Sequence, residues 1–185
     1  MKLYGSYTSP YVRHCRVALA QSSFDYEFVE ADYVMSAENS PTAKVPYFTD
    51  GELMLTDSSS ILKYIREKSG QAFLADIKDF DNYALATTLL DATINLFLIE
   101  NNGFGPEQIS YLGRQKNRIE SGLKELNERF HPDQSIDLDS TLRCLCFIDW
   151  ACFRKRISLD GLPNLQGLLN TANRVEAFSC TAPSV

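Results

Sequence analysis

The sequence predicts an α+β protein with a small mixed-sheet domain at residues 1–75 and an all-helical domain at residues 79–185. Three observations lead to this prediction. Short strand-like segments alternate with helix-like segments in the first part of the chain, and the composition changes near Gly70. Beyond that point, apolar residues recur at spacings of three and four, as on the buried faces of helices.

The first domain begins with a segment whose side chains alternate in direction, which is typical of a strand. Pro10 fits the first turn of the following helix, and Ser9 falls at its N-cap. The expected elements are, in order, a strand at 2–7, a helix from Pro10, a strand at 25–30, a polar loop with room for one helical turn, strands at 47–50 and 52–56 joined at Asp50-Gly51, and a helix capped by Asp57 or Ser58. With right-handed crossovers, this order gives a mixed sheet with helices on its faces.

The second domain is expected to hold four helices. They lie at 79–102, at 107–130 after Pro106, from Asp137 or Asp139 through Trp150, and from Pro163 onward. The first of them carries two apolar stripes, so we expect one side to pack within its domain. The other side, with Phe80, Tyr83 and Phe97, is expected to face a cleft or a second copy of the chain.

Composition excludes several classes of function. The net charge is −6 and no basic stripe is visible, which argues against nucleic-acid binding. The chain has no uninterrupted 18-residue apolar run and nothing that resembles a signal peptide, so we expect a cytoplasmic protein that does not span a membrane. Its five cysteines lie mostly in helical patterns and are interpreted as reduced thiols. No metal-ligand spacing is present, and Arg154-Lys155-Arg156 is interpreted as a solvated helix end.

Two short motifs carry the chemistry. Lys44-Val45-Pro46 opens a strand, and Asp57-Ser58 follows eleven residues after Pro46 and opens a helix. A backbone clamp next to a helix N-terminus suits a small, extended, peptide-like ligand with charged ends. An ordinary helix cap is the simpler alternative for Asp57-Ser58, as it is for Ser9.

Together with Ser-Tyr-Thr-Ser-Pro-Tyr-Val-Arg at 6–13 and Thr-Asp-Ser-Ser-Ser-Ile at 56–61, these motifs resemble a cytosolic glutathione S-transferase. The tail segments at 153–156 and 178–183 are similar to the ending of small bacterial members. The chain has Ser40-Pro41 and Asp57-Ser58 where the family more often has Asn-Pro and Glu-Ser. The resemblance implies a thioredoxin-like N-terminal domain with a cis peptide bond between Val45 and Pro46.

The resemblance also implies glutathione as co-substrate. Val45 would pair through its backbone with the cysteinyl part, and Asp57 and Ser58 would hold the γ-glutamyl end. Lys44 would reach the glycyl carboxylate, with a solvated surface lysine as the equal alternative.

Ser9 is expected to stabilise the glutathione thiolate, with Tyr7 and Thr8 in reserve. Other classes of the family use a tyrosine from this strand end, which keeps Tyr7 open. Ser9 is favoured because it directly precedes Pro10, at the start of the expected helix.

The implied activity is transfer of glutathione to a small electrophile, or peroxide reduction, in a detoxifying homodimer. A non-catalytic binding or scaffold protein is one alternative. A glutathione-dependent dehalogenase or isomerase is another.

Overall fold

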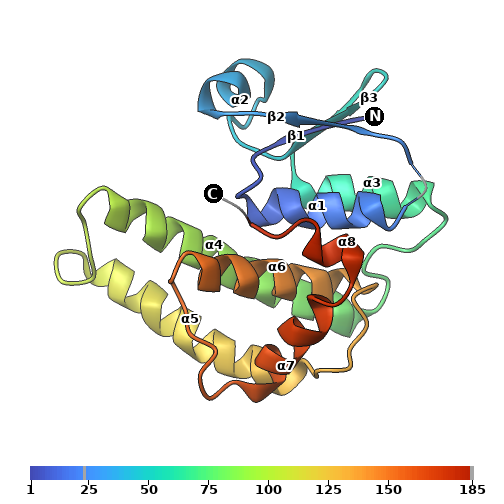
Figure 1. The fold of residues 1–185 in the computed structure, drawn as a ribbon. Coiled ribbons are helices and arrows are strands. Elements are labelled where there is room, and N and C mark those ends of the chain that lie inside the picture. The colour runs from blue at the N-terminus through green and yellow to red at the C-terminus, as the bar shows by residue number, and fades with distance from the viewer. Residues whose placement is uncertain (23, 184–185) are drawn as a thin grey trace. The chain divides into compact units, whose positions relative to one another are not determined.

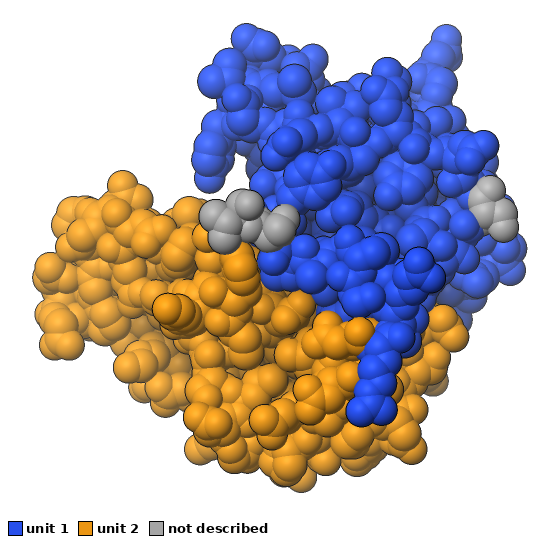
Figure 2. Space-filling model, in the orientation of Figure 1, with its two compact units in different colours: residues 1–75, 174–185 blue, residues 76–173 orange. Residues whose placement is uncertain are grey.

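The computed structural model describes residues 1–22 and 24–183. The chain divides into two compact units, coloured separately in Figure 2: residues 1–75 with 174–185, called unit 1, and residues 76–173, called unit 2. The sequence analysis assigned the last twelve residues to the helical domain, whereas here they group with the first 75. The α+β class, with a thioredoxin-like first part and a helical second part, is confirmed.

Unit 1 is built on a four-stranded sheet in the order β2-β1-β3-β4. The strands are β1 (Lys2–Gly5), β2 (Glu27–Glu30), β3 (Tyr47–Asp50) and β4 (Leu53–Leu55). β1 pairs with β2 in parallel, and the β1–β3 and β3–β4 pairs are antiparallel. Leu3 and Phe48, which are register partners, are completely buried and form the centre of this core.

Helices α1 (Pro10–Ala20) and α3 (Ser58–Lys68) pack against each other along one face of the sheet (Figure 1). Their buried apolar residues recur at helical spacing, as with Ile61, Leu62 and Ile65 in α3. Helix α2 (Tyr33–Asn39) lies on the other side of the strands and is mostly exposed. It is longer than the single turn expected from the sequence, because Asp32 caps it by accepting a hydrogen bond from the Met35 N–H at 2.8 Å.

β1 and α1 approach each other closely at Gly5. A Cβ added there would lie 2.5 Å from both methyl carbons of Val12, so no side chain fits without a shift of the helix or the strand. We expect Gly5→Ala to lower the free energy of unfolding by about 1–3 kcal/mol, measured by urea denaturation, because the core is overpacked. Truncating the neighbour, in Gly5→Ala/Val12→Ala, should give less than the summed loss of the two single variants.

Gly113 in helix α5 (Ser110–Arg129) is the matched control for this prediction, because nothing lies within 4 Å of an added Cβ there. Gly113→Ala should leave stability unchanged or raise it by up to about 1 kcal/mol, because an added methyl group meets no neighbour and alanine favours a helix more than glycine does. Equal stabilities for Gly5→Ala and the wild type would contradict the close approach.

The last residues join unit 1 through Arg13, which is 2% exposed. Its guanidinium lies 3.9 Å from the ring centroid of Phe178 and donates to the Phe178 carbonyl at 3.1 Å and the Thr181 hydroxyl at 3.3 Å. Helix α8 (Glu176–Ser179), which the sequence analysis missed, thereby packs against α1. These contacts explain why the C-terminal segment groups with the first domain.

Unit 2 is a bundle of α4 (Ile77–Asn101), α5 (Ser110–Arg129), α6 (Asp139–Phe153) and α7 (Pro163–Ala172). Helix α4 packs on both α5 and α6, in agreement with its two apolar stripes, and α7 packs on α5 and α6 (Figure 1). Gly122 allows α5 to approach α4, since an added Cβ would lie 2.3 Å from a Leu89 methyl carbon.

Two details of unit 2 differ from the sequence-based expectation. Helix α5 begins at Ser110 rather than near residue 107, because residues 105–109 form a turn in which the Gln108 side chain accepts a hydrogen bond from the Gly105 N–H. Tyr83 does not face a cleft or another chain: it is 5% exposed, and its hydroxyl accepts a hydrogen bond from the buried Arg143 of α6. Phe80, by contrast, is 52% exposed.

By length and composition alone, α4 is apolar enough to cross a membrane, and it is the single such helix among the described residues. It satisfies this criterion although the sequence has no uninterrupted apolar run of that length. Its buried residues, among them Ala86, Leu89 and Leu90, are the ones expected of a core helix packed on two neighbours.

Candidate functional site

Three segments of unit 1 lie at the same end of its sheet. β1 and β3 are antiparallel and their last paired residues there are Tyr4 and Tyr47, so the chain that follows β1 lies beside the chain that precedes β3. β4 is antiparallel to β3 and pairs Leu55 with Phe48, so α3 starts at this end as well. The register therefore gathers the segments that contain Ser9, Val45 and Asp57-Ser58, and it aims the positive ends of the α1 and α3 dipoles at one region.

Ser9 caps α1 with extended backbone angles, and its Oγ accepts a hydrogen bond from the Val12 N–H at 3.3 Å. Pro10 occupies the first helical position, where its lack of an N–H costs nothing. Since Oγ acts as an acceptor in the cap, its own proton remains to be donated outward. The helix-cap interpretation and the thiol-donor interpretation of Ser9 are therefore compatible.

The two reserve hydroxyls have other contacts. The ring of Tyr7 packs on Phe28 at a centroid distance of 4.7 Å and lies 4.8 Å from the Arg16 guanidinium carbon, on the β2 side of the strand. Thr8 forms a local turn with Ser6, in which the two side-chain oxygens are 3.1 Å apart. Of the three hydroxyls, Ser9 is the one whose contacts lie at the helix start.

The peptide bond between Val45 and Pro46 is cis, as expected from the resemblance. Val45 is half-buried and lies outside β3, and its backbone N–H and C=O have no hydrogen-bond partner among the described residues. Lys44 is exposed and forms no ion pair with any residue of the described ranges. Both residues are therefore open to an external partner.

Asp57 is the N-cap of α3, and its Oδ1 accepts a hydrogen bond from the Ser59 N–H at 2.8 Å. The residue is exposed, and within residues 1–22 and 24–183 no cation pairs with its carboxylate. Ser58 is 4% exposed, and its carbonyl accepts the weak hydrogen bond of the Cys15 thiol at 3.9 Å, which ties α1 to α3. The capping role predicted as the alternative is thus present, and one carboxylate oxygen remains outside it.

The thiols of the protein do not form a reactive centre. Cys15, Cys144 and Cys146 are buried, and no disulfide joins the described cysteines. Burial raises the pKa of Cys144 far above its usual value, and burial followed by the nearby Asp149 charge raises the pKa of Cys152 to about 11. Among the described residues, no group of three or more His, Cys, Asp or Glu residues could hold a metal ion.

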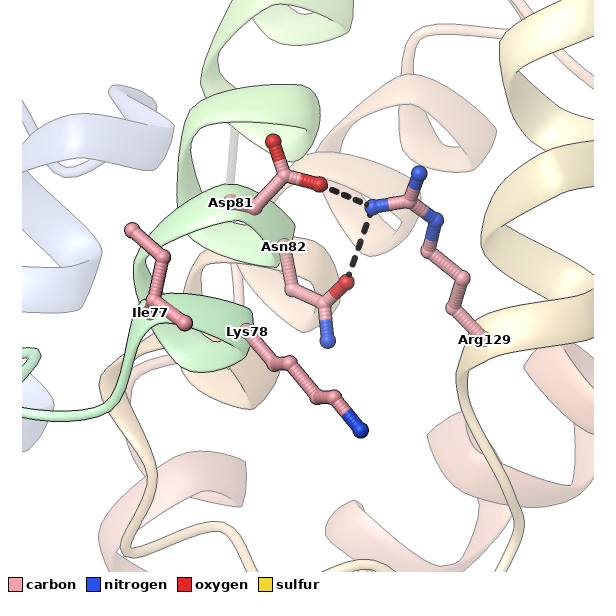
Figure 3. Close-up of a pocket in the computed structure, with 5 residues that line it drawn as sticks. All are labelled: Ile77, Lys78, Asp81, Asn82 and Arg129. Carbon is pink, nitrogen blue, oxygen red and sulfur yellow. Dashed lines mark hydrogen bonds and ion pairs between the residues drawn. The ribbon is translucent and has the colours of Figure 1, made fainter.

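An open pocket of about 500 Å³ lies in unit 2, at the start of α4 and the end of α5 (Figure 3). Arg129 donates there to Asp81 at 2.5 Å and to Asn82 at 3.2 Å, and also to Glu125 at 2.7 Å. Its charge is therefore met by two carboxylates, which raise the pKa of Arg129. This pocket contains none of the site residues predicted from the sequence.

Comparison with known proteins agrees with this geometry. Residues 3–73 match the family model of the glutathione S-transferase N-terminal domain. A probable glutathione S-transferase of rice (Oryza sativa subsp. japonica) is 31% identical over 104 residues, which cover 52% of this chain and 48% of the rice protein. Glutathione S-transferase 1 of maize (Zea mays) is 32% identical over 83 residues, 41% of this chain and 39% of the relative. The chain thus spans about half or less of the length of these curated relatives.

Solved structures extend the similarity to both units. A glutathione S-transferase from Methylobacillus flagellatus, solved with glutathione bound, has a TM-score of 0.83 and 25% identity, and the match covers 99% of each chain. Residues 3–73 therefore carry an N-terminal domain of the glutathione S-transferase family, and the likeness to solved structures continues through the rest of the chain. A family member from Methylobacterium radiotolerans, in complex with glutathione sulfonate, has a TM-score of 0.85 at 20% identity and covers 100% of this chain and 95% of its own. At that identity it supports the glutathione S-transferase fold alone.

The contacts of this chain give a reason for two features that the sequence alone did not reveal. The small residue at position 5 lets α1 sit tightly on the sheet, and Arg13 anchors the last helix of the chain to α1. The first had a visible signal, a glycine inside a strand pattern. The second had none, because its partners lie 165 and 168 residues away along the chain.

Proposed function

We propose that this chain is a glutathione S-transferase, which binds glutathione at the shared end of β1, β3 and β4 and activates its thiol for addition to a small electrophile or for peroxide reduction. The observation that carries the proposal is the common origin of Ser9, Val45 and Asp57-Ser58 at one end of the sheet, with two helix N-termini directed there. Relatives solved with glutathione or its sulfonate bound support the choice of ligand.

In the proposed complex, the open backbone groups of Val45 pair with the cysteinyl residue of glutathione. The Asp57 carboxylate meets the γ-glutamyl ammonium, and the amino end of α3 at Ser58 receives the α-carboxylate. Lys44 is placed to meet the glycyl carboxylate. Each charged end of the tripeptide thus finds a group of opposite sign.

The proposed role of Ser9 is to donate its hydroxyl proton to the sulfur at the start of α1. A free thiol has a pKa of about 8.5 and is mostly protonated at neutral pH. A hydrogen bond to a charged acceptor contributes about 1.5–3 kcal/mol, and one pKa unit corresponds to about 1.4 kcal/mol. One such bond would therefore lower the thiol pKa by about one to two units, and the helix dipole adds to it.

The reaction that follows needs no further protein nucleophile. The thiol proton leaves to solvent, and the thiolate electron pair forms the new sulfur–carbon bond. A leaving group departs with its bonding pair, and where there is none the π pair of the electrophile takes a proton from water. In peroxide reduction the thiolate attacks one peroxide oxygen, and the O–O bond breaks with its pair on the other oxygen, which takes a proton. A second glutathione then displaces water from the resulting sulfenic acid and gives glutathione disulfide. The high pKa of Cys152 and the burial of Cys144 agree with a mechanism that uses the thiol of the substrate instead of an enzyme thiol.

An isomerase is the second candidate function. A maleyl pyruvate isomerase of the Zeta class, a bacterial glutathione S-transferase, has a TM-score of 0.75 at 19% identity and covers 99% of this chain. Both candidates require the same thiolate and differ in whether glutathione stays in the product. A homodimer formed through α4, where Ile77 and Phe80 are exposed, stays a prediction.

Calorimetry with glutathione, followed by an assay of conjugation to 1-chloro-2,4-dinitrobenzene, tests the proposal. We expect saturable heat with micromolar to millimolar affinity and a conjugation rate above the uncatalysed one. S-methylglutathione should bind without supporting conjugation, since it has no thiol to ionise. Binding without any turnover would favour the scaffold alternative, and no heat at millimolar glutathione would contradict the site itself.

A further inference from the structure

Two arginines at the end of α6 lie against one aromatic ring of α4. The guanidinium carbons of Arg154 and Arg156 are 5.8 Å and 5.7 Å from the ring centroid of Phe97, and Arg154 is also 5.2 Å from that of Phe153. Trp150 meets Phe97 edge-on at 6.0 Å and fixes the ring from α6. All five residues belong to unit 2, and we call them the arginine–aromatic cluster.

The chain reversal that ends α6 brings the two arginines together. Lys155 has φ of 55°, the Lys155 N–H donates to the Cys152 carbonyl at 2.9 Å, and the Arg156 N–H donates to the Ala151 carbonyl at 2.7 Å. This is the Schellman arrangement, with a lysine at the position that glycine usually fills. The basic run is therefore more ordered than the solvated helix end expected from the sequence, since both arginines lie on aromatic surface while Lys155 is exposed.

The charges of the cluster are not balanced. Glu100 forms an ion pair with Arg156. Arg154 is half-buried, and its Nε–H is buried without an acceptor anywhere in residues 1–22 and 24–183. Its Nη groups, which are not among the buried unpaired atoms, are left for a partner from solution. A half-buried guanidinium without an anionic partner is unusual, because a buried N–H group without an acceptor destabilises the fold.

We propose that Arg154 is a binding site for the carboxylate of a small organic acid. A guanidinium presents its N–H groups in a planar fork that matches the two oxygens of a carboxylate. The ring centroids of Phe97 and Phe153 lie 5.8 Å and 5.2 Å from the Arg154 guanidinium carbon, and the two rings restrict its movement, so little side-chain freedom is lost on binding. Because Glu100 forms an ion pair with Arg156, Arg154 is the cation of the cluster that remains available to the acid. This inference goes beyond the proposed function, because the site lies in unit 2 and needs no glutathione.

Benzoate is the probe, and benzamide, which has the same shape without the charge, is its control. We expect benzoate to bind the full-length wild type saturably at about millimolar concentration, in calorimetry at low ionic strength, and to shift the Arg154 Nε–H resonance in a nitrogen-15 spectrum. Benzamide should do neither. Arg154→Gln should weaken benzoate binding at least tenfold.

The neighbouring Lys155→Gln is the matched variant, because it removes the same charge from an exposed side chain outside the cluster. It should weaken benzoate binding at most twofold. Arg154→Lys keeps the charge but lacks the planar fork, so it should weaken benzoate binding about as much as Arg154→Gln. This second variant shows whether the loss in Arg154→Gln comes from the missing fork or from a folding defect. The proposal is overturned if benzoate does not saturate, if benzamide binds equally, or if Lys155→Gln loses as much affinity as Arg154→Gln.

Discussion

Replacing Ser9 by alanine is expected to raise the pKa of the bound glutathione thiol by about one to two units, because the sulfur loses its hydroxyl donor at the start of α1. At a pH below both pKa values, conjugation should slow by about ten- to a hundredfold, since the thiolate fraction falls tenfold per unit. Glutathione affinity, measured by calorimetry, should change little. The measurement is the pH profile of kcat/KM and of thiolate absorbance.

Loss of the α1 cap could also slow conjugation in Ser9→Ala, and a second variant separates this effect from the loss of the hydroxyl donor. Alanine at an N-cap costs about 1 kcal/mol of stability, whereas glycine costs a few tenths. Ser9→Gly should therefore raise the thiol pKa as much as Ser9→Ala while keeping more of the stability. Thr8→Ala and Tyr7→Phe should leave the pKa of the bound thiol near the wild-type value, because the Thr8 hydroxyl pairs with Ser6 and the Tyr7 ring packs against Phe28 and Arg16. If Tyr7→Phe raises the pKa and Ser9→Ala does not, the assignment to Ser9 is wrong.

Replacing Asp57 by asparagine is expected to weaken glutathione binding by about ten- to a hundredfold. The loss corresponds to one charge-assisted hydrogen bond of about 1.5–3 kcal/mol, between the carboxylate and the γ-glutamyl ammonium. Asparagine caps a helix about as well as aspartate. The free energy of unfolding of Asp57→Asn should therefore lie within about 0.5 kcal/mol of the wild-type value. Calorimetry and urea denaturation measure the two effects separately.

Asp57→Ala is the companion variant, because it removes both the charge and the cap that accepts from Ser59. It should lose affinity to a similar extent and also lose about 1 kcal/mol of stability. Wild-type affinity in Asp57→Asn would mean that Asp57 only caps α3.

The strands and helices of residues 1–75 were predictable because their signals are local. Ser9-Pro10 marks a helix start by the chemistry of the first turn, and Asp50-Gly51 marks a hairpin by its backbone requirement, met here with φ of 60° at Gly51. Ser9, Val45 and Asp57 lie at one end of the sheet because of the strand directions. In an antiparallel pair, the C-terminal end of one strand lies beside the N-terminal end of its neighbour.

Features that depend on distant partners could not be predicted. Arg13 looks like a surface residue of an amphipathic helix, but the last helix of the chain buries it. Tyr83 and Phe80 lie on the same apolar stripe of α4, and the sequence predicts the same exposure for both. Tyr83 is nevertheless buried beside Arg143 of α6, whereas Phe80 is exposed. Asp137 and Asp139 both read as caps for α6, whereas the N-cap is Leu138, which makes no side-chain cap bond. In each case packing decides over local preference.

In the proposed complex, the amino end of α1 holds the sulfur of glutathione as a thiolate. Ultraviolet difference absorbance of the wild-type complex, followed across pH at saturating glutathione, reports the pKa of the bound thiol directly. We expect a pKa of about 6.5–7.5, one to two units below that of a free thiol. A bound thiol that ionises at the same pH as free glutathione would contradict it.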